Sequence, residues 1–166
     1  MRINEFGKEE ILFPLIITTV ALIILLTYPV IEACKVVIDG TVYVTSPNTR
    51  VSIRLEYEHS VELSEVTEVY EVTNCEIWLA EFVWAGYGAG LPSRPGDAPN
   101  QSVSAGGKYV ARNMILNTTT LKISMRYRVN PEITINGEEV VSKEEIVVEA
   151  CTKISVVEWV FSQKLR

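Results

Sequence analysis

A run of 21 residues without a charged side chain, Ile11 to Ile31, constrains this chain more than any other feature. An α-helix rises about 1.5 Å per residue, so a helix over this run is about 31 Å long. That length matches the roughly 30 Å hydrocarbon core of a bilayer. The run therefore predicts a single transmembrane helix over residues 11–31, preceded by a short tail at residues 1–10.

The tail does not have the form of a cleaved secretory leader. Such a leader has a plainly basic start, a shorter apolar core and a small-residue cleavage site. Here three glutamates accompany Arg2 and Lys8 ahead of the run. We expect an uncleaved anchor in the cell membrane. The positive-inside rule favours an extracytoplasmic location for residues 32–166, and their length is that of one domain.

Charge excludes one class of partner. The chain carries 21 acidic and 15 basic residues, a net charge of −6. Nucleic-acid binding depends on a basic surface, so nucleic acid is not an expected partner.

Beyond the apolar run, the alternation of apolar and polar residues indicates β-strands. The clearest case is Arg50 to His59, where Val51, Ile53, Leu55, Tyr57 and His59 share one face. The dipeptides Asp39-Gly40 and Asn136-Gly137 are typical of tight hairpins. The expected fold class is all-β, a sandwich or a partly closed barrel. Its strands are expected at 35–44, 50–59, 66–73, 76–85, 108–116, 120–129 and 133–135, with the final strands between 138 and 161.

Charges are segregated along the predicted strands. Eight carboxylates and no base lie between Arg54 and Arg94, and a stretch without acids holds five bases, Lys108, Arg112, Lys122, Arg126 and Arg128. Opposite charges on neighbouring strands favour pairing, so we expect these two segments to face each other. An acidic surface for a cation or a basic partner is the alternative interpretation.

The single histidine is the main candidate for chemistry. His59 continues the inward face of its strand, and Glu68 falls on the inward phase of the next one. A buried carboxylate needs a donor, so the two side chains are natural partners. The pair either pins the hairpin register or contributes a polar contact to a binding site. Ser60 lies beside His59, but adjacent strand residues point to opposite faces and do not form a catalytic dyad.

A glycine-rich segment, Gly86 to Pro92, begins a long predicted loop that continues to Gly107. It is not a phosphate loop, because no helix follows and prolines remove backbone donors. We expect no cofactor and no metal site. An enzyme with His59 as general base ranks below a binding module, because the chain offers no second histidine and no suitable nucleophile.

The cysteines leave alternatives open. Cys75 and Cys151 form a disulfide, or both are small buried residues in strands. Cys34 is a free thiol near the membrane face, or the lipidated cysteine of an imperfect lipoprotein box.

Two motifs together resemble the prokaryotic family called domain of unknown function 1850. They are His59-Ser60-Val61-Glu62 followed by Glu68, and Tyr87-Gly88-Ala89-Gly90-Leu91-Pro92. The resemblance implies one local site made of His59, Ser60, Glu68, Tyr87, Gly88, Gly90, Leu91 and Pro92. It also implies association with tripartite solute transporters of the TAXI type, without a known activity.

These observations predict a membrane-anchored, extracytoplasmic β-domain that acts as a binding or accessory module and is not an enzyme. Its expected partners are the membrane and transporter subunits. The alternative is a structural subunit of a surface filament or layer, in which apolar helices of several copies pack together.

Overall fold

The computed structural model describes residues 6–61, 63–86, 91, 100–103 and 106–164, with the side chains of 6–11 and 163–164 outside that description. Its elements divide into two compact units. One holds residues 1–31 and 153–162, and the other holds residues 32–152 and 163–166.

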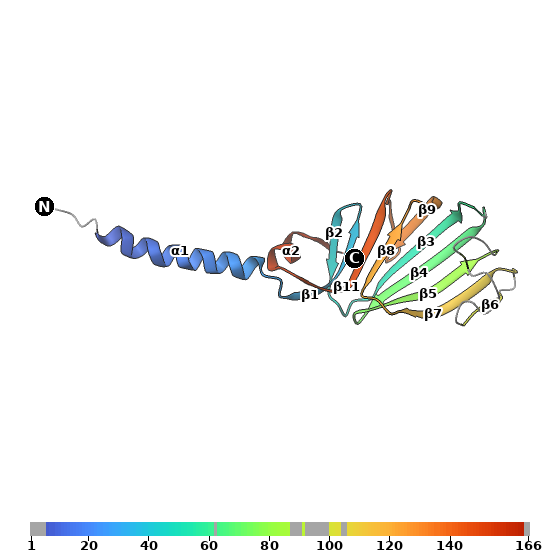
Figure 1. The fold of residues 1–166 in the computed structure, drawn as a ribbon, viewed down its shortest axis with the longest axis horizontal. Coiled ribbons are helices and arrows are strands. Elements are labelled where there is room, and N and C mark those ends of the chain that lie inside the picture. Colours follow the sequence, from blue (N-terminus) through green and yellow to red (C-terminus); the bar gives the residue numbers. More distant parts are fainter. Residues whose placement is uncertain (1–5, 62, 87–90, 92–99, 104–105, 165–166) are drawn as a thin grey trace. The chain divides into compact units, whose positions relative to one another are not determined.

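The second unit is an all-β sandwich (Figure 1). Its five-stranded sheet has the order β12-β2-β1-β11-β8, and its seven-stranded sheet has the order β10-β9-β3-β4-β5-β7-β6. All neighbouring strands of the seven-stranded sheet pair antiparallel, as do β1 with β2 and β8 with β11, whereas β12 pairs parallel with β2. The strands are β1 Ile31–Ile38, β2 Thr41–Thr45, β3 Val51–His59, β4 Glu65–Thr73, β5 Glu76–Trp84, β6 Ser102–Val103, β7 Tyr109–Leu116, β8 Thr120–Ser124, β9 Arg128–Ile135, β10 Glu138–Val140, β11 Glu145–Ile154 and β12 Gln163–Lys164.

The strands form two separate sheets, which distinguishes the sandwich from the barrel alternative, and both sheets contribute to one hydrophobic core. The alternation on β3 and β4 agrees with the sequence prediction, because alternate residues of each strand are buried. Fully buried core side chains include Val36, Val51, Ile53, Leu55, Val66, Ile77, Trp84, Ile146 and Val148. The two predicted hairpins are also confirmed: Asp39 and Gly40 have φ of 46° and 85°, and Asn136 and Gly137 have φ of 53° and 85°.

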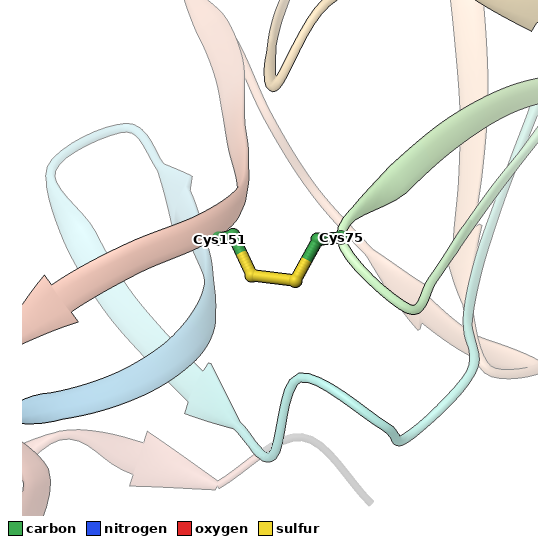
Figure 2. The surroundings of a disulfide bond; sticks show 2 residues. All are labelled: Cys75 and Cys151. Atoms are coloured by element: carbon green, nitrogen blue, oxygen red, sulfur yellow. A yellow bond between two sulfur atoms is a disulfide. The ribbon is translucent and has the colours of Figure 1, made fainter.

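A disulfide between Cys75 and Cys151 joins the two sheets (Figure 2). Cys75 lies in the turn between β4 and β5, and Cys151 lies on β11, 76 residues later in the chain. The sequence leaves open whether these two cysteines form a disulfide or are separate buried thiols, and the structure contains the disulfide. Cys34 is a free thiol that is fully buried in the core on β1.

The amino-terminal helix differs from its predicted bounds. Helix α1 spans Phe6–Thr27, and β1 already begins at Ile31. Pro29 explains the earlier end, because a proline disfavours helical geometry at the preceding residue. Among residues whose side chains the structure describes, no helix is both long and apolar enough to cross a membrane.

Two expectations about the carboxyl-terminal half are wrong. The predicted strand 120–129 is two elements, β8 and the start of β9, with a turn between them. The predicted final strands at 138–161 include a short helix, α2 Val156–Phe161. The Ser155 hydroxyl accepts a hydrogen bond from the Glu158 backbone N–H at 3.1 Å and caps this helix, a sequence signature that the strand prediction overlooked.

Candidate functional site

Three predicted site residues line one small cavity in the sandwich. His59, Glu68 and Leu91 share this cavity, of about 190 Å³, with Tyr57, Phe82, Tyr127 and Arg128. Ser60 is exposed in the turn after β3 and is not among the lining residues. Tyr87, Gly88, Gly90 and Pro92 lie outside the described residues. The cavity therefore combines the His59 end of β3 with one residue from the glycine-rich segment.

Glu68 is the centre of a buried polar network. It lies on the inward face of β4, as its phase in the sequence predicts, and it is only 7% exposed. Tyr57 donates to its Oε1 at 2.7 Å, and Tyr70 donates to its Oε2 at 3.0 Å. Arg128 donates to both oxygens, at 3.1 and 2.9 Å. The carboxylate thus accepts four hydrogen bonds, which fill its usual capacity as an acceptor.

Arg128 is held from three sides. Besides the ion pair with Glu68, it donates to the Ser124 carbonyl oxygen, and its guanidinium lies 4.7 Å from the centre of the Tyr57 ring. Burial acts to lower the pKa of Arg128, but the charge of Glu68, its hydrogen bonds and the neighbouring Tyr57 and Tyr70 together outweigh burial, and the pKa rises. The guanidinium is therefore a fixed, permanently charged part of the site.

The two tyrosines stay protonated around neutral pH and can act as donors. Burial raises the pKa of Tyr57 and of Tyr70, and the adjacent charge of Glu68 raises both further. Their hydroxyls therefore retain the protons that bind the carboxylate.

A bulge between β3 and β9 brings Arg128 to this position. Glu56 pairs with Glu132, but Glu58 pairs with Val129, so Asn130 and Pro131 together face the single residue Tyr57. Shifting register by one residue exchanges the two faces of a strand. The residue opposite His59 is consequently Arg128, whose side chain falls on the inward face. Pro131 has no N–H to donate, and the bulge accommodates it.

His59 lies at the edge of this network. It is half-buried, it faces Arg128 across the β3–β9 pairing, and its Nδ1 accepts a hydrogen bond from the Val61 backbone N–H at 3.4 Å. Glu68 is paired with Leu55, four residues from His59, or about 13 Å along the strand. Direct pairing of His59 with Glu68 stays a prediction. The partners of Glu68 that the sequence analysis missed are Tyr57, Tyr70 and Arg128.

The segregated charges do meet, as predicted. Lys108 pairs with Glu65 at 2.8 Å, Arg112 with Glu81 at 2.9 Å and Arg128 with Glu68 at 2.9 Å. The first two pairs are exposed and contribute little to stability, whereas the third is largely buried. Within the part of the chain that the structure describes, no group of three or more His, Cys, Asp or Glu side chains could hold a metal ion.

Apolar residues surround the same end of the sandwich. Phe82 stacks on the fully buried Trp84 with ring centres 4.7 Å apart, which gives the cavity a rigid aromatic side. Val61 and Leu63 of the β3–β4 turn and Tyr127 of the β8–β9 turn are exposed. The buried ionic network, the small cavity and these exposed apolar side chains therefore occur together at the His59 end of the sandwich.

Fold and site together define a disulfide-linked β-sandwich protein with a buried Glu–Arg–Tyr network beneath a small cavity. A comparison with protein families identifies the family: the chain belongs to the family described as Domain of unknown function (DUF1850), whose model matches residues 53–141. No curated protein and no solved structure matches the chain. The matched residues include most of β3, all of β4 and β9, and the whole Glu68 network.

Proposed function

We propose that this protein is a membrane-attached, extracytoplasmic accessory module that binds a partner protein through the His59 end of its sandwich. The observation that carries the proposal is the cavity of about 190 Å³ between the Glu68–Arg128 network and exposed apolar side chains. The network fixes three strands at this end, so a partner meets a preformed surface and little ordering of the protein opposes binding.

Attachment to a membrane is supported by the apolar helix. The 21-residue run from Ile11 to Ile31 has no charge, and large apolar side chains are exposed along α1 from Leu12 to Leu25. A helix with apolar residues on all sides requires an apolar environment. The Cys75–Cys151 disulfide supports an extracytoplasmic location, because disulfides persist in oxidising compartments.

The partner is a subunit of a solute transporter in this proposal. The basis is the family resemblance, which implies association with transporters of the TAXI type. In this proposal His59 and Tyr127 supply polar contacts at the cavity. Val61 and Leu63 in the adjacent turn supply an apolar surface of defined shape. Tyrosine is one of the residue types that commonly carry the affinity of protein interfaces, so Tyr127 is the main anchor in this proposal, with Val61 and Leu63 as surrounding apolar contacts.

Copurification tests this function. The full-length tagged chain is crosslinked in its own membranes, extracted in mild detergent and purified, and bound proteins are identified by mass spectrometry. Tyr127→Ala and His59→Ala are compared with Lys122→Ala, an exposed position on β8 in the other sheet. We expect transporter subunits with the wild type and the control, and several-fold less with Tyr127→Ala. Equal recovery with all folded variants would remove the proposed site.

A filament or layer subunit is the second candidate, and the exposed apolar side chains of α1 favour it as well. In that case the crosslinked product contains copies of this chain and no transporter subunit. Amino-terminal sequencing separates the two candidates further, since a pilin-like subunit loses a leader and an anchored accessory protein keeps the residues before α1.

A further inference from the structure

The unit that contains α1 presents a second apolar surface on α2. Helices α1 and α2 contact each other in this unit, and the Val30 backbone N–H donates to the Ile154 carbonyl oxygen at 3.1 Å. This hydrogen bond ties the segment after α1 to the residues just before α2. The start of α2 is therefore fixed next to the carboxyl-terminal end of α1.

One side of α2 is apolar and exposed. Val157, Val160 and Phe161 have the i, i+3, i+4 spacing that places residues on one helix face. Phe161 is 82% exposed and Val160 is 64% exposed. We call this surface the α2 face.

Both ends of α2 are capped by hydrogen bonds, but the rest of the protein does not bury its side chains. Ser155 caps the amino-terminal end, and the Ser162 backbone N–H donates to the Glu158 carbonyl oxygen at 2.9 Å at the other end. None of the residues of α2 is buried. The apolar side chains of the α2 face therefore need another partner to remove them from water, a transfer that is favourable for large apolar side chains.

We infer that the α2 face lies in the interfacial layer of the bilayer that receives α1. This inference rests on the proposed membrane attachment. Helices α1 and α2 contact each other and both expose apolar side chains, so one bilayer can remove both sets of side chains from water. The hydrogen bond at Val30 fixes α2 at the end of α1, where a membrane helix meets the lipid headgroups. The exposed ring of Tyr28 fits that depth because tyrosine is enriched at membrane interfaces, and the exposed ring of Phe161 fits because phenylalanine is common on the apolar face of interfacial helices.

The test measures the depth of single labels in lipid vesicles. Phe161→Cys provides an accessible thiol for a fluorescent label, because Cys34 is buried and Cys75 and Cys151 are bonded to each other. Leu22→Cys on α1 reports insertion of the anchor, and Lys122→Cys on the sandwich is the control for a position outside the bilayer. The full chain is reconstituted in phosphatidylcholine–phosphatidylglycerol vesicles that carry a quencher near the headgroups or deep in the acyl chains. Val160→Cys replaces Phe161→Cys if that variant does not fold.

We expect the label at residue 161 to be quenched by the shallow quencher several-fold more than the label at residue 122. Equal quenching at 161 and 122, together with strong quenching at 22, would overturn the inference and leave the anchor intact. No quenching at residue 22 would overturn the anchor and this inference together. Self-quenching between labels at 161 that rises with protein density, without quenching by lipid, would assign the α2 face to a second copy and would also overturn the inference.

Discussion

The Arg128 guanidinium donates to both carboxylate oxygens of Glu68 across 60 residues of sequence, and this pair joins β9 to β4 beneath the cavity. The strand between them, β3, contributes Tyr57 to the same carboxylate. Three neighbouring strands of the seven-stranded sheet are therefore connected by one polar centre as well as by backbone hydrogen bonds.

The first prediction concerns this ion pair. Arg128→Met leaves the Glu68 charge buried without its cation, and we expect the free energy of unfolding to fall by about 3 kcal/mol. The double variant Glu68→Leu/Arg128→Met removes both charges and should lose less than the single variant. Urea unfolding of the full chain in detergent micelles, followed by tryptophan fluorescence, measures both.

Arg112→Met is the matched control for this experiment. Its partner Glu81 lies on the neighbouring strand in an exposed pair, so the loss should stay below about 1 kcal/mol. Equal losses for Arg112→Met and Arg128→Met would show that burial of the Glu68 pair has no special weight.

The second prediction is a loss of stability in alkali. Burial and the charge of Glu68 raise the pKa of Tyr57 and Tyr70 above the ordinary value of 10.0. The folded state therefore binds more protons than the unfolded state above that pH, and linkage makes stability fall as pH rises beyond about 10. The melting temperature measured at a series of alkaline pH values checks this.

The matched variant is Tyr57→Phe/Tyr70→Phe, which has lost both titrating hydroxyls. It should be less stable than wild type at neutral pH, by about 1 to 2 kcal/mol for each hydrogen bond to the carboxylate, and its stability should depend less on alkaline pH. A wild-type slope that persists unchanged in the double variant would contradict the assignment. Tyr43→Phe on β2 controls for removal of a tyrosine hydroxyl elsewhere.

The sequence predicts one side of this network and misses the other for a definite reason. Glu68 could be placed inward because β4 alternates without interruption from Val66 to Val72. Arg128 could not, because simple alternation back from Ile133 places Val129 inward, and only the bulge at Asn130 and Pro131 reverses the faces. A bulge depends on the pairing of two strands, which a single sequence does not give.

The other differences have similar causes. The disulfide between Cys75 and Cys151 could not be predicted, because it depends on how the two sheets stack. Only the stacking brings the β4–β5 turn of one sheet next to β11 of the other. In contrast, α2 carried a local signal, Ser155 followed by Glu158, which is the capping pattern of a helix start. Four residues of the glycine-rich motif lie outside the described part of the chain, so the expectations about them stay predictions.

The third prediction concerns the disulfide. A crosslink that closes a loop of about 76 residues restricts the unfolded chain, and the entropy model gives about 4 kcal/mol. Cys75→Ser/Cys151→Ser should therefore unfold at clearly lower urea concentration, as measured by tryptophan fluorescence. Mass spectrometry after alkylation of the unfolded, unreduced wild type should find one reactive thiol, and three would contradict the bond.

The fourth prediction concerns Asp39, in the β1–β2 turn. Its carboxylate accepts hydrogen bonds from the backbone N–H groups of Lys143, Glu144 and Glu145 and from the Ser142 hydroxyl, at 2.7 to 3.3 Å. The Lys143 N–H is the main reason that the pKa of Asp39 is lowered below 3.8. A lowered pKa in the folded state means that its stabilising contribution is present above about pH 4 and is lost as pH falls below it.

Asp39→Asn should flatten the decrease of melting temperature between pH 5 and pH 2, because the titrating group is gone. Ser142→Ala removes one donor and keeps the carboxylate, so it should retain most of the wild-type slope. The same slope in Asp39→Asn as in wild type would show that other carboxylates account for the acid sensitivity.

The last prediction concerns the reactivity of Cys34. Burial raises the pKa of its thiol to about 11, so almost no reactive thiolate forms at neutral pH, and the side chain is fully buried on β1. A maleimide reagent should therefore leave the folded chain unlabelled at pH 7 and should modify one thiol after unfolding in urea. Cys34→Ala is the control that loses this labelling. Rapid modification of the folded wild type would place Cys34 at the surface, and a lipid found on it by mass spectrometry would restore the lipoprotein alternative, which the buried position of this side chain in the core opposes.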